Sequence, residues 1–414
     1  MQETSRYTVG IDVGTTTVRC VVGHSDGTSG TPTIVGVGSA PNNGMRKGVV
    51  AHLNGPAQAI DDALGEAERM SGYQVNAAAL SINGAHITST KADGMIAVGG
   101  ADHEINHDDI ARIEEVATIG KIPANRKILD VVPHSYRLDG QDNIKDPLGM
   151  TGTRLEIDAN VISALAPHID NLTKAAEIAT VQATAVTPSV LAAARAVVSE
   201  QQMENGVAVI DLGGATTSVA VFEEGDLQYV AIIPVGGVNI SNDLAIGLKT
   251  DPEIAEQVKL KHASAIVRSE SESISVKHDD QTHAFESHDV DEIIEARLEE
   301  IFEAVQKELK KAGRAGKLPS GVVLTGGTAN IAGITQFAKE KLGLAAKIGK
   351  PTGFGGVADN VDLPEFATVI GLMLLDAQGG GVVVQPSKSS KSGGKKAMKQ
   401  ASGFISSLLD KFKA

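Results

Sequence analysis

The architecture of this chain follows from two similar stretches, TVGIDVGTTTVRCVVGHSDG (residues 8–27) and VAVIDLGGATTSVAVFEEGD (residues 207–226). Each has an apolar strand that ends in Ile-Asp, a turn with glycine and small hydroxylated residues, and a second apolar strand. Asp12 and Asp211 occupy the same position in the two stretches and lie 199 residues apart, a period far too long for a solenoid repeat, which indicates two related domains. Strands and helical patterns follow each hairpin, for example at 57–70 and 251–260, so we predict an α/β fold.

The residue types in the two hairpins indicate a phosphate site. Gly14, and Gly213 with Gly214, allow backbone N–H groups to approach an anion, and neighbouring threonine hydroxyls can donate hydrogen bonds. An aspartate beside phosphate is repulsive unless a cation lies between them, so Asp12 and Asp211 indicate Mg²⁺ held through water. One Asp-x-Gly sequence alone is commonly a strand-end turn, but two matching copies favour binding. The sequence contains no G-x-x-x-x-G-K-[ST] motif.

A third glycine element lies late in the chain, in GVVLTGGTANIAGI (residues 321–334). Its pattern predicts a strand, a sharp turn at Gly326-Gly327 and the start of a helix. A strand that leads through a glycine turn into a helix often has only a structural role. Its position after the second hairpin suggests that it belongs to the same site.

Composition and charge exclude several classes of protein. The 414 residues are enough for two or more domains, and 42% apolar with 21% charged residues is typical of a globular protein. No Trp, few other aromatic residues and a net charge of −14 disfavour nucleic acid as a partner. Cys20 is the single cysteine and the first residues lack an apolar signal region, so we expect a reducing cytoplasm. The longest strongly apolar run, 367–375, is too short to span a membrane.

The C-terminal segment differs in charge from the rest of the chain. Seven lysines and one aspartate give residues 387–414 a net charge of +6, which leaves −20 on the remainder. We predict a flexible basic linker at 386–401 and an amphipathic helix at 402–414. The apolar face of that helix contains Phe404, Ile405, Leu408, Leu409 and Phe412. The helix would bind an anionic membrane surface weakly as one copy and strongly in an oligomer, or it would pack on the body as a terminal helix.

The three glycine elements, in their order along the chain, resemble the phosphate-1, phosphate-2 and adenosine motifs of the superfamily of actin, DnaK-type chaperones and sugar kinases. Within it, the chain resembles the FtsA family of bacterial cell-division proteins from about residue 7 to 375. The supporting stretches are LSINGAHI (80–87), the segment around DGQDNIKDPLGMTG (128–156), 236–265 and 324–334. The linker and terminal helix are similar to the membrane-targeting sequence of the family.

The resemblance implies a two-domain actin-like, ribonuclease-H-like fold with the inserted subdomain 1C that FtsA proteins carry. By this likeness, domain 1A covers 7–84 and 163–198, subdomain 1C covers 85–162, domain 2A covers 199–240 and 314–385, and subdomain 2B covers 241–313. The late helix of the 2A range is expected to return to domain 1A, and subdomain 1C is expected to contact neighbouring protomers.

The resemblance also implies a function. FtsA-like proteins bind ATP between the two domains, polymerise, and tether FtsZ filaments to the inner membrane through the terminal helix. The chain is then expected at the cytoplasmic face of the membrane at the division site, as a peripheral protein. Its implied partners are the C-terminal peptide of FtsZ, further copies of itself and later division proteins.

We expect a nucleotide site at sixteen positions, fifteen of them carried over residue by residue from the family motifs and one, Arg19, inferred from its place on the same strand. These are Asp12, Gly14, Thr15, Thr16, Arg19, Asp211, Gly213, Gly214, Thr216, Gly236, Gly237, Glu256, Lys259, Gly326, Gly327 and Asn330. Glu256 and Lys259 would flank ribose and adenine. Read without the family, they form an i, i+3 ion pair on a solvated helix face.

Departures from the family pattern bear on mechanism. Thr17 stands where the family usually has lysine, and Arg19, on the same face of the strand, is expected to supply the missing positive charge. Ala215 replaces the usual third glycine, and Ser218 the usual aspartate, so we expect ATP binding with weak or absent hydrolysis. Glu200 is a candidate general base only by its position, and an exposed helical glutamate is the favoured interpretation.

The remaining alternatives concern the partner site and the class of protein. Arg297, in the helical run 289–313, is a candidate contact for the FtsZ peptide, although a charged helix face is ordinarily only solvated. A PilM-like cytoplasmic actin homologue of a type IV pilus or secretion assembly is the main rival. A sugar or acetate kinase needs a catalytic carboxylate and a polar substrate pocket that the sequence does not reveal. A chaperone needs a further substrate-binding domain.

Overall fold

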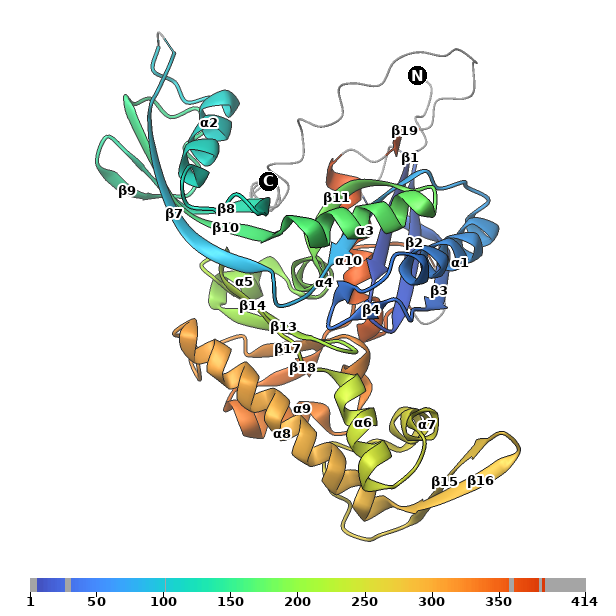
Figure 1. Cartoon of the computed structure of the whole chain (residues 1–414). Helices are drawn as coiled ribbons and strands as arrows, with labels where there is room; N and C mark the ends of the chain where they lie inside the picture. Colours follow the sequence, from blue (N-terminus) through green and yellow to red (C-terminus); the bar gives the residue numbers. More distant parts are fainter. Residues whose placement is uncertain (1–5, 27–30, 101, 357–360, 380–381, 384–414) are drawn as a thin grey trace.

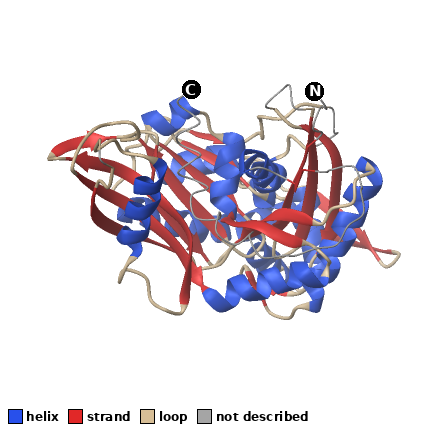
Figure 2. Cartoon of the chain, turned by 90° about the horizontal axis from the view of Figure 1, so that it is seen from above, coloured by secondary structure: helices blue, strands red, loops and turns tan. Residues whose placement is uncertain are grey.

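The computed structural model describes residues 6–26, 31–100, 102–356, 361–379 and 382–383. The chain folds into two lobes, each built on a mixed sheet that carries helices (Figures 1 and 2). This confirms the predicted α/β architecture with two related halves. The predicted linker at 386–401 and the predicted helix at 402–414 lie outside the described residues.

The first lobe is built on a sheet with the strand order β11-β6-β1-β2-β3, to which β19 adds beside β1. Its strands are β1 (Arg6–Val13), β2 (Thr17–Ser25), β3 (Thr33–Pro41), β6 (Ala77–Ile82), β11 (Gln182–Pro188) and β19 (Val382–Val383), with the small hairpin β4 (Met45–Arg46) and β5 (Val49–Val50). Its helices are α1 (Asn54–Ser71), α3 (Ala166–Ile178) and α4 (Ser189–Val197).

The second lobe repeats this strand order as β14-β13-β12-β17-β18. Its elements are α5 (Glu200–Asn205), β12 (Val207–Leu212), β13 (Thr217–Glu223), β14 (Asp226–Ile233), β17 (Val322–Thr325), η1 (Gly327–Asn330), α9 (Ile334–Leu342), β18 (Ala346–Ile348) and η2 (Pro364–Phe366). In both lobes an antiparallel three-stranded meander is extended by two parallel strands. The register matches as well, because Asp12 pairs with Arg19 where Asp211 pairs with Ser218.

A separate subdomain is inserted between β6 and α3 (Figure 1). It consists of β7 (Thr88–Ala97), α2 (His107–Thr118), β8 (Arg126–Leu138), β9 (Gln141–Ile144) and β10 (Arg154–Leu165), with the strand order β7-β10-β8-β9. Asn106 begins α2 with a capping box, and Ile113 and Ala117 of this helix are fully buried in the core of the subdomain.

The inserted subdomain also contacts the second lobe. The Asn160 side-chain Nδ2 donates to the carbonyl oxygen of Leu227 over 2.9 Å, and Lys145 forms an ion pair with Asp226. Lys145 belongs to the DGQDNIKDPLGM segment on which much of the family resemblance depends. These contacts connect the subdomain to β14, so it does not depend on the first lobe alone for its position.

The far end of the second lobe consists of α6 (Gly237–Gly247), α7 (Pro252–His262), the hairpin β15 (Ser273–His278) and β16 (Gln281–Glu286), and the long helix α8 (Ser287–Lys311). The hairpin projects from the body (Figure 1). Arg297 of α8 forms an ion pair with Asp243 of α6 and another with Glu300. Its guanidinium is therefore engaged within the protein, and the predicted FtsZ contact at this residue stays a prediction.

The late helix α10 (Ala367–Gly379) packs on the first lobe although the chain reaches it from the second. A Cβ on Gly10 of β1 would lie 2.4 Å from the carbonyl oxygen of Val369, and one on Gly371 would lie 1.7 Å from that of Ala192. The helix is apolar all round and buried, as expected of an element enclosed by other structure. Within the described residues, the search for membrane-spanning helices identified none.

We expect Gly371→Ala to destabilise the protein by about 3 kcal/mol or more, because the new methyl group would overlap the backbone of α4. Thermal and urea unfolding measure the effect. Gly65→Ala in α1 is the matched control, since the nearest atom to its new Cβ is the end of the Arg69 side chain at 3.6 Å. It should stabilise the protein by roughly 0.5–1 kcal/mol. Equal stability of the two variants would contradict the close contact between α10 and α4.

Candidate functional site

The two repeated hairpins form equivalent turns. The Gly14 amide donates to the carbonyl oxygen of Thr17 over 3.1 Å, and the Gly213 amide donates to that of Thr216 over 2.9 Å. Asn42 holds the first turn, because its Nδ2 donates to the Gly14 carbonyl and its amide to the Thr16 carbonyl, both over 2.8 Å.

The two turns face each other across the boundary between the lobes. A Cβ on Gly214 would lie 2.9 Å from both Oγ1 and Cγ2 of Thr16. Only glycine permits this approach. Thr16 is exposed, Thr15 is half-buried and Thr216 is buried. The structure thus brings together the predicted residues of the first and second phosphate loops.

The other predicted glycines gather around the second turn. The Gly237 amide and the Thr328 hydroxyl donate to the carbonyl oxygen of Gly213 over 3.0 and 3.1 Å. A Cβ on Gly236 would lie 2.5 Å from the same oxygen. The third glycine element therefore lies directly beside the second hairpin.

The residues of the third glycine element (321–334) differ in their surroundings. A Cβ on Gly326 would collide with Asp211 Oδ1 at 2.5 Å, whereas one on Gly327 would meet open space. Asn330 is exposed, and its Nδ2 donates to Glu365 over 2.8 Å. Its side chain is thus held at the surface by η2.

Glu256 and Lys259 form the expected ion pair, with 2.7 Å between Oε2 and Nζ. Lys259 Nζ also donates to the Gly237 carbonyl over 3.2 Å and to Ser241 Oγ over 2.9 Å. The Lys259 side chain is only 11% exposed. The interpretation as a solvated surface pair is therefore wrong for Lys259, which is enclosed beside the glycines at the start of α6.

Two carboxyl groups lie behind the facing turns. Burial raises the pKa of Asp12, against the opposing effects of a hydrogen bond from Ser81 and the positive charge of Arg19. Burial and then the Asp12 charge raise the pKa of Asp211 to about 7, again opposed by Ser189 and Arg19. Two acidic groups this close favour a proton or a cation between them. Within the described part of the chain, no cluster of three His, Cys, Asp or Glu side chains suited to a metal was found.

Arg19 lies opposite Asp12 on the neighbouring strand. Its guanidinium carbon is 5.4 Å from the centroid of the Phe366 ring, a cation–π distance. The Arg19 charge lowers the pKa of both carboxyl groups, so the side chain is placed to compensate negative charge in this site.

Sequence reasoning missed a set of polar residues that hold the two carboxyl groups. Ser81 Oγ donates to Asp12 Oδ1 over 2.7 Å, and Ser189 Oγ donates to Asp211 Oδ2 over 3.3 Å. Asn83 Nδ2 donates to Ser189 Oγ over 2.9 Å. The available signal was LSINGAHI, a strand followed by polar residues, since the carboxyl end of a strand parallel to β1 meets the same edge of the sheet.

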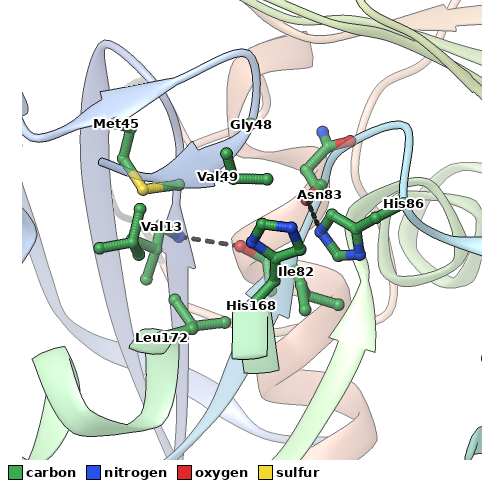
Figure 3. Close-up of a pocket in the computed structure, with 11 residues that line it drawn as sticks. Val13, Met45, Gly48, Val49, Ile82, Asn83, His86, His168 and Leu172 are labelled. Carbon is green, nitrogen blue, oxygen red and sulfur yellow. Dashed lines mark hydrogen bonds between the residues drawn. The ribbon is translucent and has the colours of Figure 1, made fainter. Parts of the chain in front are cut away.

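A small pocket adjoins this network (Figure 3). Val13, Met45, Ile82 and Leu172 provide apolar walls, and Ser81, Asn83, His86 and His168 provide polar groups. The imidazole rings of His86 and His168 stack with their centroids 4.3 Å apart. Burial, and then the neighbouring His168, lower the pKa of His86 to about 4. His86 is therefore neutral near pH 7, and its stacking on His168 joins the start of the inserted subdomain to α3.

Glu200, the candidate general base, is exposed at the start of α5 behind the N-cap Ser199. Burial lowers the pKa of Arg195, and the Glu200 charge opposes this shift. A carboxylate at this position stabilises the helix N-terminus, which favours the structural interpretation.

Comparisons with known proteins agree with this geometry. The model of "Cell division protein FtsA" matches residues 208–371, and the model of "SHS2 domain inserted in FTSA" matches residues 84–163. The cell division protein FtsA of Pseudomonas aeruginosa is 33% identical over 396 residues, which cover 94% of both chains.

Solved structures show the likeness of fold. The PilM-PilN type IV pilus biogenesis complex has a TM-score of 0.64 at 16% identity, over 89% of this chain and 98% of that chain. MreB5 of Spiroplasma citri bound to ADP has a TM-score of 0.54 at 14% identity, over 90% and 96%. At such identities the likeness concerns the fold alone, and it confirms the predicted actin-like architecture. The family models and the relative from P. aeruginosa together show that the chain belongs to the FtsA family of cell division proteins.

Proposed function

We propose that this chain binds Mg²⁺–ATP between its two lobes. The observation that carries the proposal is the contact between the two hairpin turns at Thr16 and Gly214, with the half-buried Asp12 and the buried Asp211 behind them. The turns would hold the phosphates, and the two carboxyl groups would hold Mg²⁺ through water. The Mg²⁺ ion would neutralise phosphate charge beside the carboxylates.

The nucleoside would lie along the second lobe. Gly327 leaves room for a ligand, because a Cβ there would meet open space, and Gly236, Gly237 and Gly326 allow the surrounding segments to pack closely. Lys259 and Glu256 are held beside these glycines. The ADP in the MreB5 structure supports a nucleotide in a fold of this kind. We expect weak or absent hydrolysis, since no candidate general base is apparent among the described residues around the carboxyl groups.

We further propose that the protein polymerises and links FtsZ filaments to the cytoplasmic face of the membrane at the division site. Membership of the FtsA family supports this role, and the basic, amphipathic sequence of 402–414 supports an anionic membrane surface as the anchor. The pilus-type alternative rests on likeness of fold at 16% identity, whereas the division role rests on similarity of sequence along nearly the whole chain.

Arg19→Ala should weaken Mg²⁺–ATP binding by about 10- to 150-fold, because a charge-assisted contact contributes roughly 1.5–3 kcal/mol. Titration with a fluorescent ATP analogue measures the dissociation constant. Thr17→Ala is the control, since it keeps the backbone carbonyl that closes the first turn. Unchanged affinity in Arg19→Ala would exclude Arg19 as the substitute for the missing lysine.

The membrane anchor is tested by co-sedimentation with liposomes in the presence of ATP. The full chain should sediment with liposomes rich in anionic lipid, and a chain that ends at Gln385 should stay in the supernatant. Leu408→Asp should reduce binding because it places a charge on the apolar face, and Ser406→Asp on the polar face should reduce it much less. Equal sedimentation of the full and shortened chains would exclude this tether.

The FtsZ contact is tested by titration with an FtsZ C-terminal peptide. Arg297→Gln should weaken binding if Arg297 meets the peptide. Asp243→Asn removes an internal partner of Arg297 and serves as the control. If both variants bind the peptide more weakly, the ion pair between Arg297 and Asp243 shapes the binding surface. If neither variant binds it more weakly, Arg297 is not a contact.

A further inference from the structure

The two carboxyl groups at the centre of the site are held in the same way by different donors. In the first lobe the Val13 amide donates to Ser81 Oγ over 2.8 Å, and Ser81 donates to Asp12. For Asp211 of the second lobe, two residues of the first lobe do this: Asn83 Nδ2 donates to Ser189 Oγ, and Ser189 donates to Asp211. A hydroxyl has one hydrogen, so a serine that accepts from a fixed donor can direct its own hydrogen at the carboxylate.

The orientation of the Asn83 amide is itself fixed by the backbone. The Gly84 N–H donates to Asn83 Oδ1 over 2.8 Å, and a backbone N–H can only donate. Nδ2 must therefore face Ser189. Ser218 of the second lobe also donates to Oδ1, over 3.3 Å. Asn83 thus contacts both lobes with one side chain.

The main chain of Asn83 is anchored too. Its carbonyl oxygen lies 3.1 Å from Nε2 of His86, as Figure 3 shows, and a carbonyl can only accept. The proton of His86 is therefore on Nε2. His86 stacks on His168, and its own carbonyl accepts from Arg126. The Asn83 side chain, which directs the Ser189 hydroxyl, therefore belongs to a segment that is fixed by hydrogen bonds and by the stacking of His86 on His168.

We propose that Asn83 is a positioning residue for the Mg²⁺ site, which fixes the direction of the Ser189 hydroxyl and so the setting of the Asp211 carboxylate. The inference rests on the proposed Mg²⁺–ATP site. Ser189 holds Oδ2 of Asp211, and Oδ1 lies against Gly326, so the Ser189 hydroxyl is a donor that sets the direction of this carboxylate. The group that donates to Ser81 is a backbone amide, whereas the group that donates to Ser189 is the Asn83 side chain, which a substitution can remove.

The experiment titrates Mg²⁺ against the full chain at a fixed concentration of a fluorescent ATP analogue. Asn83→Ala should raise the Mg²⁺ concentration at half-maximal binding about tenfold, the scale seen when partners of metal-binding groups are removed. Saturating Mg²⁺ should restore nucleotide binding, which it would not do for a misfolded site. Ser189→Ala should have the same effect, and the double variant should lose less than about twofold more, because both residues act through one path.

Asn160→Ala is the matched control. Its amide also joins the lobes, by donating to the Leu227 carbonyl, but it is not part of the path to Asp211. Its Mg²⁺ midpoint should equal that of the wild type. Asn83→Ser, whose shorter side chain cannot reach Ser189, is a second variant if Asn83→Ala does not fold.

Two results would overturn the inference while leaving the nucleotide site intact. One is an Mg²⁺ concentration at half-maximal binding that stays within twofold of the wild-type value in both Asn83→Ala and Asn83→Ser. The other is a double variant in which the effects of Asn83→Ala and Ser189→Ala add in full. A wild-type chain that binds no Mg²⁺–ATP would instead overturn the proposed nucleotide site, and this inference with it.

Discussion

Two neighbouring acidic side chains, the half-buried Asp12 and the buried Asp211, are the constraint on which the rest of the structure depends. Asp12 and Asp211 end equivalent strands in two lobes, and both lose most of their water. Two carboxylates brought together in this way repel each other unless a cation, a proton or hydrogen-bond donors compensate them. The serine hydroxyls and Arg19 supply part of that compensation. Such a pair costs stability, which is readily understood if it serves a ligand.

The close approach of the lobes depends on residues without side chains. Gly214 lies against Thr16 of the other lobe, and Gly236 lies against the carbonyl of Gly213. Gly10 and Gly371 allow α10 to lie against β1 and α4, so a helix reached from the second lobe completes the core of the first. The abundant glycines therefore have two roles, because they permit the close contacts of the candidate site and the close packing that joins the lobes.

The inserted subdomain is attached at more than one place. Arg126 donates to the carbonyls of His86 and Ser163, where the chain enters and leaves the subdomain. Asn160 and Lys145 connect its sheet to β14 of the second lobe. An element inserted in one lobe thus contacts both. A relative movement of the lobes would have to break these contacts or carry the subdomain with it.

Much of the fold was predictable from the printed residues, because strand periodicity, turn glycines and a repeated pattern are local properties. The two hairpins, the third glycine element and the family resemblance needed no contact map. The roles of Asn83, Ser81 and Ser189 could not be predicted in this way. These residues lie far from the aspartates along the chain, and only the parallel pairing of β6 with β1 and the packing of α4 bring them to the carboxyl groups.

The same distinction applies to charged residues. Local spacing identified Glu256 and Lys259 as a pair, but only the packing of α7 against α6 shows that Lys259 is enclosed. Local spacing also placed Arg297 on a charged helix face, but only the tertiary structure shows that it forms an ion pair with Asp243. The amino-acid order is sufficient for patterns that repeat within a few residues. Which hydrogen bonds a polar side chain makes is decided by tertiary structure, because its partners come from distant segments and the loss of water makes each pairing matter.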